Sequence, residues 1–537
     1  MFKNMLTCKN MLLGSTLFIS LFACACSADI LDHTIIFDVK HQTIGTTSYE
    51  IFNITKFNYF IDIINIPKVV DFLIIQVHTL NENVTLAYTS WDKSHTSGTN
   101  VGLVKITFGN TRETFQLFRY EAGFNQALNI LVAVSVYTKN DPIPGGCNDS
   151  FETEFAPYQK ISFTKEIVTV RSQPPSQFST LCNKSGIVTD MYYMYLPESE
   201  NIMEYFVAIQ KMLNAEDIKL YGTKVPYGLE PNKYNLMYNN YRGIGRVFAI
   251  VATSDRGRSA YVPAVSFGCS TGKSGENCTG PDEFPWALVI ALMLILGLFI
   301  CFFGHRFFKT TTFVNTAMLI VFFMMIATTL DDEFTSEGKS VYSLLMGAVV
   351  GGVWVFLWWW LGIPVLAVLT TFLLTGILIA SVFFFIPYGN LSTLFGGRFT
   401  FWAIFGAIVL ICQLPLFYLT PTAHIMAISL LSSYAVIVAL NYYIAGNLYY
   451  IIINTYRRIA IDKFEEVVID PPYHFANISA TVLWVILFLA GVYFQWKNSV
   501  GRPPFPPHRR RSLNGGANWE RRPLINRETP SPDYSQH

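Results

Sequence analysis

The sequence predicts a multi-domain membrane protein, in which a β-rich ectodomain of two β-sandwich-like repeats precedes an α-helical bundle of seven transmembrane helices. Two observations support this fold class. Only 14% of the 537 residues are charged, whereas a typical soluble protein has about 25%. Apolar and polar residues are interleaved before Phe284, but apolar residues form long runs from Pro285 to about Lys497. The net charge of +1 gives no sign of a nucleic-acid partner.

Residues 1–25 have the pattern of a cleaved secretory signal peptide. Two lysines precede an apolar run, and Ala23-Cys24-Ala25 then supplies an A-x-A cleavage pattern. An uncleaved membrane anchor is the alternative. Cleavage would place the β-rich half on the outer or luminal side of the membrane.

Four cysteines lie in the β-rich half well beyond the predicted cleavage site: Cys147, Cys182, Cys269 and Cys278. An even number favours disulfide bonds in an oxidising compartment, and three pairings are possible. A bridge between Cys269 and Cys278 closes the easiest local loop and would leave Cys147 with Cys182. A zinc site is the weaker alternative, because the sequence has no C-x-x-C and no nearby pair of histidines.

The β-rich half also carries five N-x-S/T sequons, which are acceptors for N-linked glycans in secreted proteins. We therefore expect a glycosylated ectodomain. The five asparagines are Asn53, Asn83, Asn148, Asn183 and Asn277.

Residues 26–147 and 148–284 are predicted to form the two β-rich repeats. Stretches such as DFLIIQVHTL and NVTLAYTS are rich in β-branched and aromatic residues, and Asn, Gly and Ser turns separate them. A weak internal similarity supports the repeat, because an apolar strand, a polar turn, a proline-containing stretch and a cysteine occur in this order twice. DFLIIQVHTLNENVTLAYTS and YFVAIQKMLNAEDIKLYGTK also correspond, although the second stretch could hold a short helix. The pattern is typical of β-sandwiches, and the ectodomain is expected to bind an unidentified protein partner.

The second half contains seven apolar runs, each close to the roughly 20 residues that a helix needs to cross a bilayer. The predicted spans, which together cover residues 285–496, are 285–304, 311–330, 341–362, 364–387, 399–420, 422–446 and 478–496.

Charge in the loops predicts the orientation of these spans. The first loop holds Arg306 and Lys309, whereas the second, DDEFTSEGKS, is strongly acidic. The tail, residues 497–537, is again basic. Because Lys and Arg are enriched in cytoplasmic loops, the N-terminus is expected outside and the tail in the cytosol. The chain is accordingly expected at the plasma membrane after passing through the secretory pathway, with cycling through endosomes or lysosomes as an extension of this prediction.

Ionisable residues are almost absent from the spans, where they are costly and usually functional. His424 is the one clear case, and it is interpreted as a hydrogen-bonded interfacial residue rather than a ligand. A proton-coupled transporter, a seven-span zinc hydrolase and an intramembrane protease would each need more such residues. The sequence therefore predicts a non-enzymatic protein without a catalytic residue, a bound metal or a cofactor.

Two other functions stay open. A channel or transporter could use Asn315, Gln413 and Asn441 to line a polar path, although such residues more often bond across helices. A G-protein-coupled receptor is less favoured, because the third span is not followed by Asp-Arg-Tyr and the seventh lacks Asn-Pro-x-x-Tyr.

Gly347, Gly351, Trp354 and Trp358 follow a 4-3-4 spacing in the third span and so share one stripe of a helix. The two glycines form a G-x-x-x-G pair, which allows close approach of another helix. We expect the stripe to hold the bundle together or, less favourably, to form a homodimer. The run 358–360 of three tryptophans is expected at the cytosolic interface, where tryptophans anchor helices.

The tail has the charge, proline and glycine content of a disordered segment that could contact anionic lipid. Glu520, Leu524 and Ile525 resemble an acidic dileucine sorting signal, which would bind a clathrin adaptor. The phosphorylation candidates are Ser512, Thr529 and Ser531.

A family resemblance rests on the loop Gly304-His305-Arg306-Phe307-Phe308-Lys309 and on the stretch GGVWVFLWWWLGIPVLAVL. Both resemble the seven-pass domain of the transmembrane seven superfamily member three family. The layout of signal, glycosylated β-rich ectodomain, seven spans and short basic tail is also similar. The resemblance implies a non-enzymatic surface or endomembrane protein linked to cell survival and to attenuation of endoplasmic reticulum stress.

Overall fold

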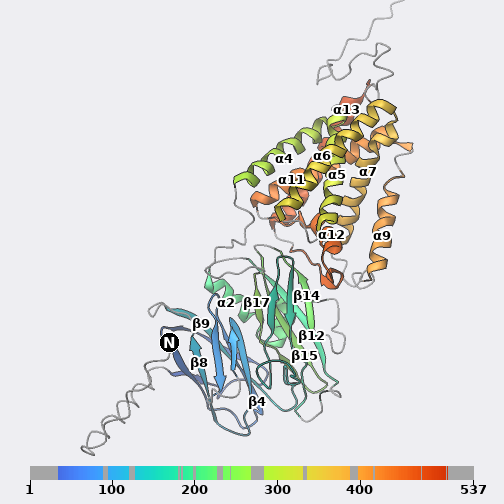
Figure 1. Ribbon diagram of the computed structural model, residues 1–537. Helices are drawn as coiled ribbons and strands as arrows, with labels where there is room; N and C mark the ends of the chain where they lie inside the picture. The colour runs from blue at the N-terminus through green and yellow to red at the C-terminus, as the bar shows by residue number, and fades with distance from the viewer. Residues whose placement is uncertain are drawn as a thin grey trace, which may run out of the picture. The chain divides into compact units, whose positions relative to one another are not determined.

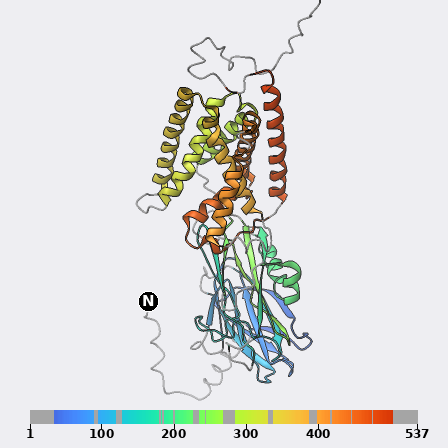
Figure 2. The ribbon, with the colours of Figure 1, turned by 90° about the vertical axis from the view of Figure 1, so that its right-hand side faces the viewer.

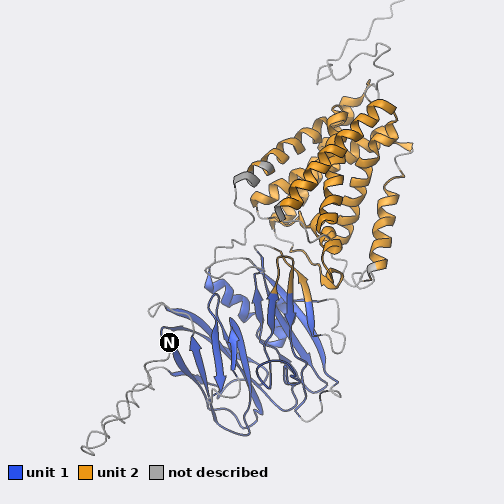
Figure 3. Ribbon diagram, in the orientation of Figure 1, with its two compact units in different colours: residues 1–162, 169–236, 244–275 blue, residues 163–168, 237–243, 276–537 orange. Residues whose placement is uncertain are grey.

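The computed structural model describes residues 34–88, 95–119, 127–178, 182, 186–197, 201–225, 234–241, 244–267, 284–329, 336–386, 397–414, 418–444, 446–472, 475–502 and 505. The chain forms two compact units (Figure 3). The first comprises residues 1–162, 169–236 and 244–275, and the second comprises 163–168, 237–243 and 276–537. The predicted signal peptide, the tail sites, Cys269, Cys278, Asn183 and Asn277 lie outside the described residues.

The first unit begins with a sandwich of two sheets. One sheet has the order β1 (Thr34–Asp38), β3 (Asn58–Ile64), β8 (Arg112–Arg119), β5 (Val84–Tyr88) and β6 (His95–Gly98). The other has the order β2 (Thr47–Ile54), β9 (Leu128–Tyr137), β4 (Phe72–His78) and β7 (Asn100–Ile106).

Alternating residues of the strands fill the space between these two sheets. Ile61 and Ile63 of β3 share one buried cluster with Leu73, Ile75 and Val77 of β4. This spacing of two follows from the pleat, which points successive side chains to opposite faces of a strand.

The second β-rich domain is built around β12 (Val188–Pro197) and β15 (Ile244–Thr253), which pair antiparallel along their whole lengths. Their sheet also contains β13 (Thr223–Lys224), β16 (Arg258–Ala260) and β17 (Ala264–Ser266). A second sheet has the order β10 (Lys160–Phe163), β11 (Ile167–Arg171), β14 (Asn235–Asn239) and β18 (Val467–Val468).

Two helices, α2 (Ile202–Gln210) and α3 (Ala215–Tyr221), also belong to this domain. The Asn201 side chain caps α2 by accepting a hydrogen bond of 3.1 Å from the backbone N–H of Met203. The expected strand correspondence between this stretch and DFLIIQVHTLNENVTLAYTS is therefore wrong in secondary structure. A capped helix replaces the strands, because its apolar residues have helical spacing and pack on the sheet.

The two β-rich domains share apolar clusters within the first unit. Leu131 and Ala133 of β9 pack with Tyr205 and Phe206 of α2 in one of them. The Tyr205 hydroxyl also shares its single proton between the Thr79 carbonyl and Asn100 Oδ1, each 2.8 Å away. The two β-rich domains therefore pack against each other within the first unit.

The second unit is mainly helical (Figure 1, Figure 2). Five of its described stretches are long and apolar enough to cross a membrane, and two further apolar stretches, 290–303 and 399–411, are shorter. All seven overlap the predicted spans. Their helices are α4 (Phe284–Phe303), α5 (Phe308–Thr329), α6 (Ser336–Leu361), α7 (Pro364–Phe385), α9 (Arg398–Ile411), α11 (Thr420–Ile444) and α13 (Phe475–Ser499).

Packing in this unit centres on α11, which contacts α4, α7 and α13. On the other side α5 packs on α6 and α7, and α9 packs on α7. The chain turns directly from α6 into α7, because Gly362 adopts a φ of 71° and Pro364 occupies the first turn of α7.

A short helix that the sequence did not predict, α12 (Tyr450–Ala460), follows α11. It carries Arg457 and Arg458 in its last turn and is amphipathic. The second unit also takes in residues 163–168 and 237–243 of the β-rich region. There, Met237 and Tyr238 of β14 pair in parallel with Val467 and Val468 of β18.

Candidate functional site

The turn between β7 and β8 presents the most exposed phenylalanine ring among the described residues of the first sandwich. The Asn110 backbone N–H donates to the Thr107 carbonyl at 2.8 Å, and the two central residues, Phe108 and Gly109, have φ of 46° and 83°. Positive φ at both positions is the arrangement of a type I′ turn, which favours Asn-Gly because bulky residues are strained there. Phe108 occupies the strained position and is 86% exposed.

A neighbouring loop holds this turn in place and adds a second apolar side chain. The Thr107 backbone N–H donates to the Asp71 carbonyl at 3.0 Å, and its hydroxyl donates to the Val70 carbonyl at 2.7 Å. Val69, next in this loop, is 57% exposed. We call residues 65–71 and 107–111 together the loop tip. Sequence reasoning missed it, because a phenylalanine before the glycine in ITFGNT argues against a turn of this type.

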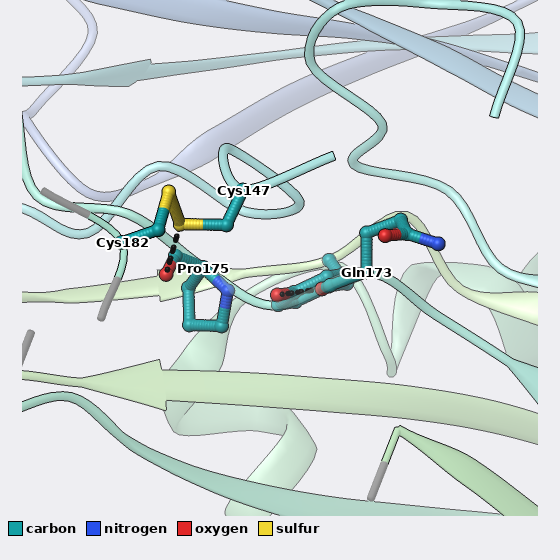
Figure 4. Close-up of a disulfide and its surroundings, with 5 residues drawn as sticks. Cys147, Gln173, Pro175 and Cys182 are labelled. Carbon is teal, nitrogen blue, oxygen red and sulfur yellow. Dashed lines mark hydrogen bonds between the residues drawn. A yellow bond between two sulfur atoms is a disulfide. The ribbon is translucent and has the colours of Figure 1, made fainter. Parts of the chain in front are cut away.

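The structure shows a disulfide bond between Cys147 and Cys182 (Figure 4). This is the pairing expected if Cys269 bonds to Cys278. The Cα atoms of Cys147 and Cys182 are 5.7 Å apart, and 35 positions separate them in the sequence. The bridge lies beside Pro175, and the Cys147 backbone N–H donates to the Pro174 carbonyl at 3.0 Å. It therefore fastens the start of the second β-rich domain to the segment that follows β11.

The described sequons differ in the exposure and hydrogen bonding of their asparagine side chains. Asn53 and Asn83 are exposed. The Asn148 amide nitrogen instead donates to the Phe151 and Thr153 carbonyls, and its oxygen accepts from the Ser150 and Phe151 N–H groups. Glycosylation itself stays a prediction, and this geometry favours Asn53 and Asn83 as acceptors.

The glycine stripe of α6 lies against α5. A Cβ atom at Gly347 would be 2.7 Å from Val321 Cγ2 and 2.8 Å from the Ala317 carbonyl oxygen. A Cβ atom at Gly351 would be 3.0 Å from the Phe313 carbonyl oxygen. The two glycines therefore allow the backbones of α6 and α5 to approach closely.

The tryptophans at the end of α6 have two different environments. Trp358 is only 3% exposed, and its ring centroid lies 5.0 Å from that of Phe308. This packing fits the predicted stripe, and the place of Trp358 at the cytosolic interface stays a prediction. Trp359 and Trp360 are exposed, as an anchoring role requires.

His424 lies inside the bundle and faces a second histidine, His305, with their Nδ1 atoms 3.3 Å apart. His424 is fully buried, and its place at the membrane interface stays a prediction. The His305 backbone N–H donates to Gln495 Oε1 at 2.8 Å. His305 was overlooked because it lies in the loop before α5. Across the described residues, no group of three or more His, Cys, Asp or Glu could hold a metal ion.

Arg457 of α12 is a second overlooked residue. It is 7% exposed, and its Nη1 donates to Asn239 Oδ1 at 2.5 Å and to the Asn240 carbonyl at 3.2 Å. The Tyr450 ring lies 5.1 Å from its guanidinium carbon. Neutral oxygens and an aromatic face thus bind this buried cation, and they connect α12 to segment 237–243.

A cavity of about 880 Å³ lies among α4, α5, α7, α11 and α12. Two of the polar residues suggested for a conduit, Asn315 and Asn441, line it. The Asn315 amide nitrogen donates to Thr371 Oγ1 at 3.1 Å, whereas Gln413 bonds to Val409 of its own helix. Asn315 and Gln413 thus each donate one hydrogen bond to another group of the protein, and the channel alternative stays a prediction.

Three family models match the chain in order. They describe a TM7SF3-like N-terminal immunoglobulin-like domain at residues 42–137, a TM7SF3-like second immunoglobulin-like domain at 142–272 and a TM7S3/TM198-like domain at 290–496. The chain belongs to the TM7SF3-like family. This confirms the resemblance seen in the sequence.

Individual relatives agree with this TM7SF3-like assignment. The chain is 28% identical over 487 residues to Transmembrane 7 superfamily member 3 of Mus musculus, covering 85% of each chain. It is 27% identical over 484 residues to the Homo sapiens protein of the same name, covering 85% of this chain and 84% of the relative. The predicted fold class is confirmed as well, with both β-rich repeats matching immunoglobulin-like domains.

Proposed function

We propose that the chain is a non-enzymatic membrane glycoprotein whose ectodomain binds a protein partner through the loop tip. As the family resemblance implies, it would support cell survival and attenuate endoplasmic reticulum stress. It would travel through the secretory pathway to the plasma membrane, with its N-terminus outside and its C-terminus in the cytosol.

The observation that carries this proposal is the strained, exposed ring of Phe108. A bulky residue at positive φ costs on the order of 1–3 kcal/mol, and such outliers cluster at functional sites. A ring that is 86% exposed contributes little to the core in return. Loops at the end of an immunoglobulin-like sandwich are frequent recognition sites, and aromatic side chains dominate many protein interfaces.

The test exchanges Phe108 for glycine in the full-length chain. Phe108→Gly removes the ring and also relieves the backbone strain, so the variant should fold at least as well as the wild type. Proximity labelling from the outer face in cells should lose one or more proteins that the wild type labels. Phe57→Gly is the matched control, because Phe57 is an exposed ring elsewhere in the same domain.

A second measurement connects binding to stress. In cells lacking the protein, wild type and Phe57→Gly should lower a reporter of the unfolded-protein response after tunicamycin, and Phe108→Gly should not. If Phe108→Gly labels the same proteins as the wild type, the loop tip is not the binding site. If it loses a partner but still lowers the reporter, that partner has no part in the stress response.

A further inference from the structure

The cavity in the helical unit has the size of a small-molecule site. Its volume of about 880 Å³ falls within the roughly 300–1,000 Å³ of typical ligand pockets. It exists because α4 packs on α11 and α13, whereas α5 packs on α6 and α7. These two helices therefore form separate walls, and α7 and α11 contribute the rest of the lining.

The walls are apolar and reach the lipid-facing surface. Met293 and Leu296 of α4 lie in one wall, and Met318 and Phe322 of α5 lie in the other. Leu296 and Met318 are exposed, so a ligand can enter sideways from the bilayer. None of the described residues that line the cavity is charged, and a charged ligand buried here would have no counter-ion.

One polar side chain of the cavity lining has a buried amide without a hydrogen-bond partner. Asn441 is 1% exposed, and neither its Oδ1 nor its Nδ2 has a partner among the described residues. Buried amides without partners are rare in folded proteins, because each one costs free energy. Gly446, which also lines the cavity, leaves the space that this amide occupies, since a Cβ there would lie 2.2 Å from Asn441 Oδ1.

Two other polar side chains of the lining already have partners. Ser432 Oγ donates to the Ile428 carbonyl at 2.6 Å, and the Tyr434 hydroxyl donates to the Leu448 carbonyl at 3.0 Å. Asn441 differs from them in offering both a free donor and a free acceptor. A hydroxyl group complements this pair, because it can donate to Oδ1 and accept from Nδ2.

We infer that the cavity binds an uncharged membrane lipid whose hydroxyl head group pairs with the Asn441 amide. The apolar body of the lipid lies between α4 and α5, where flexible methionine side chains adapt to its shape. A sterol and a monoacylglycerol both have this chemistry. The inference is independent of the proposed function, because it rests on residues of the helical unit alone.

The test uses the full-length chain in phosphatidylcholine nanodiscs with three diazirine-bearing probes: cholesterol, monoacylglycerol and phosphatidic acid. At least one hydroxyl probe should label peptides from α11 around Asn441, and the same unlabelled lipid should compete. The probe that labels distinguishes a sterol from an acylglycerol. Equal labelling by the phosphatidic acid probe, no labelling by either hydroxyl probe, or no competition would overturn the inference.

Variants then locate the site. Asn441→Leu should lower labelling at least fivefold without a loss of thermal stability, because the amide that it removes has no partner to lose. Val438→Phe should fill the cavity and have the same effect, whereas Val349→Phe adds the same ring to an exposed position on α6 and should change nothing. Wild-type labelling in folded Asn441→Leu would reject the role of the amide. If Val438→Phe fails to fold, the competition experiment still decides whether a hydroxyl lipid is bound.

Discussion

Arg457 of α12 donates a hydrogen bond to the side chain of Asn239, 218 positions earlier in the sequence. Asn239 in turn donates from its Nδ2 to Asn454 Oδ1 at 3.0 Å, so α12 and the end of β14 share a buried polar network. The Tyr450 ring, which lies beside Arg457, makes an edge-to-face contact with Tyr241, with ring centroids 4.8 Å apart.

Removing this cation should destabilise the second unit. Arg457→Met keeps most of the side-chain volume but leaves the Asn239 and Asn240 oxygens buried without that donor, at a cost of about 1–3 kcal/mol. The thermal midpoint of the purified chain should fall, and protease sensitivity should rise near segments 163–168 and 237–243. Lys463→Met is the control, because Lys463 is exposed, and it should leave both readouts unchanged. Equal midpoints for Arg457→Met and the wild type would show that the network contributes no net stability.

The glycine stripe offers a matched pair of neighbouring positions. Gly351→Leu should force α6 away from Phe313 of α5 and cost at least about 1–3 kcal/mol through overpacking. Gly352→Leu should be tolerated, because nothing lies within 4 Å of a Cβ built at Gly352. Surface delivery and thermal stability should fall for the first variant alone. Equal behaviour of the two variants would mean that close packing of α5 and α6 is unimportant.

The burial of His78 predicts that the folded protein loses stability in acid. It is buried in β4, and burial lowers its pKa from 6.5 to about 4 despite the 2.8 Å hydrogen bond to Asn100. Because the unfolded chain binds the proton more readily, the stabilising contribution is complete above pH 6.5 and disappears as the pH falls towards 4. At about 1.4 kcal/mol per pKa unit, the loss is on the order of 3 kcal/mol.

Thermal melts of the full chain between pH 7.5 and pH 4 measure this effect. His78→Gln should flatten the dependence on pH, whereas the exposed control His41→Gln should keep it. An unchanged slope in His78→Gln would assign the acid sensitivity to other groups.

The sequons should differ in use. Asn53→Gln and Asn83→Gln should each remove one glycan, seen as a mass shift that disappears after glycosidase treatment. Asn148→Gln should leave the glycan count unchanged but lower stability by about 1 kcal/mol, because it disrupts the hydrogen bonds of the Asn148 side chain to the backbone. A glycan found on Asn148 would show that the glycan is transferred to this residue before the turn forms.

Features encoded by local patterns were predictable from the sequence. A run of about 20 apolar residues defines a span without reference to the rest of the chain, and alternating β-branched residues define strands. The G-x-x-x-G pair predicted close helix packing, although only the structure shows that α5 is the partner. In YFVAIQKMLNAEDI the helix was one of two options, because short apolar runs fit either period.

The features that were missed depend on long-range contacts. His305 meets His424 only after two spans pack together, and Arg457 meets Asn239 only when α12 and β14 are in place. Sequence spacing does not indicate which apolar helices leave a cavity between them. The position of Phe108 depends on a backbone conformation that phenylalanine rarely adopts, so its residue type argued against that turn.

The strand β14 starts in the first unit and ends in the second, and this limits how the chain can be divided. A chimera between relatives that exchanges everything before residue 276 would combine segments 163–168 and 237–243 of one parent with α12 and β18 of the other. Compatible chimeras should exchange both short segments together with the helical half. For the same reason, residues in these segments and in α12 should change together from one relative to another.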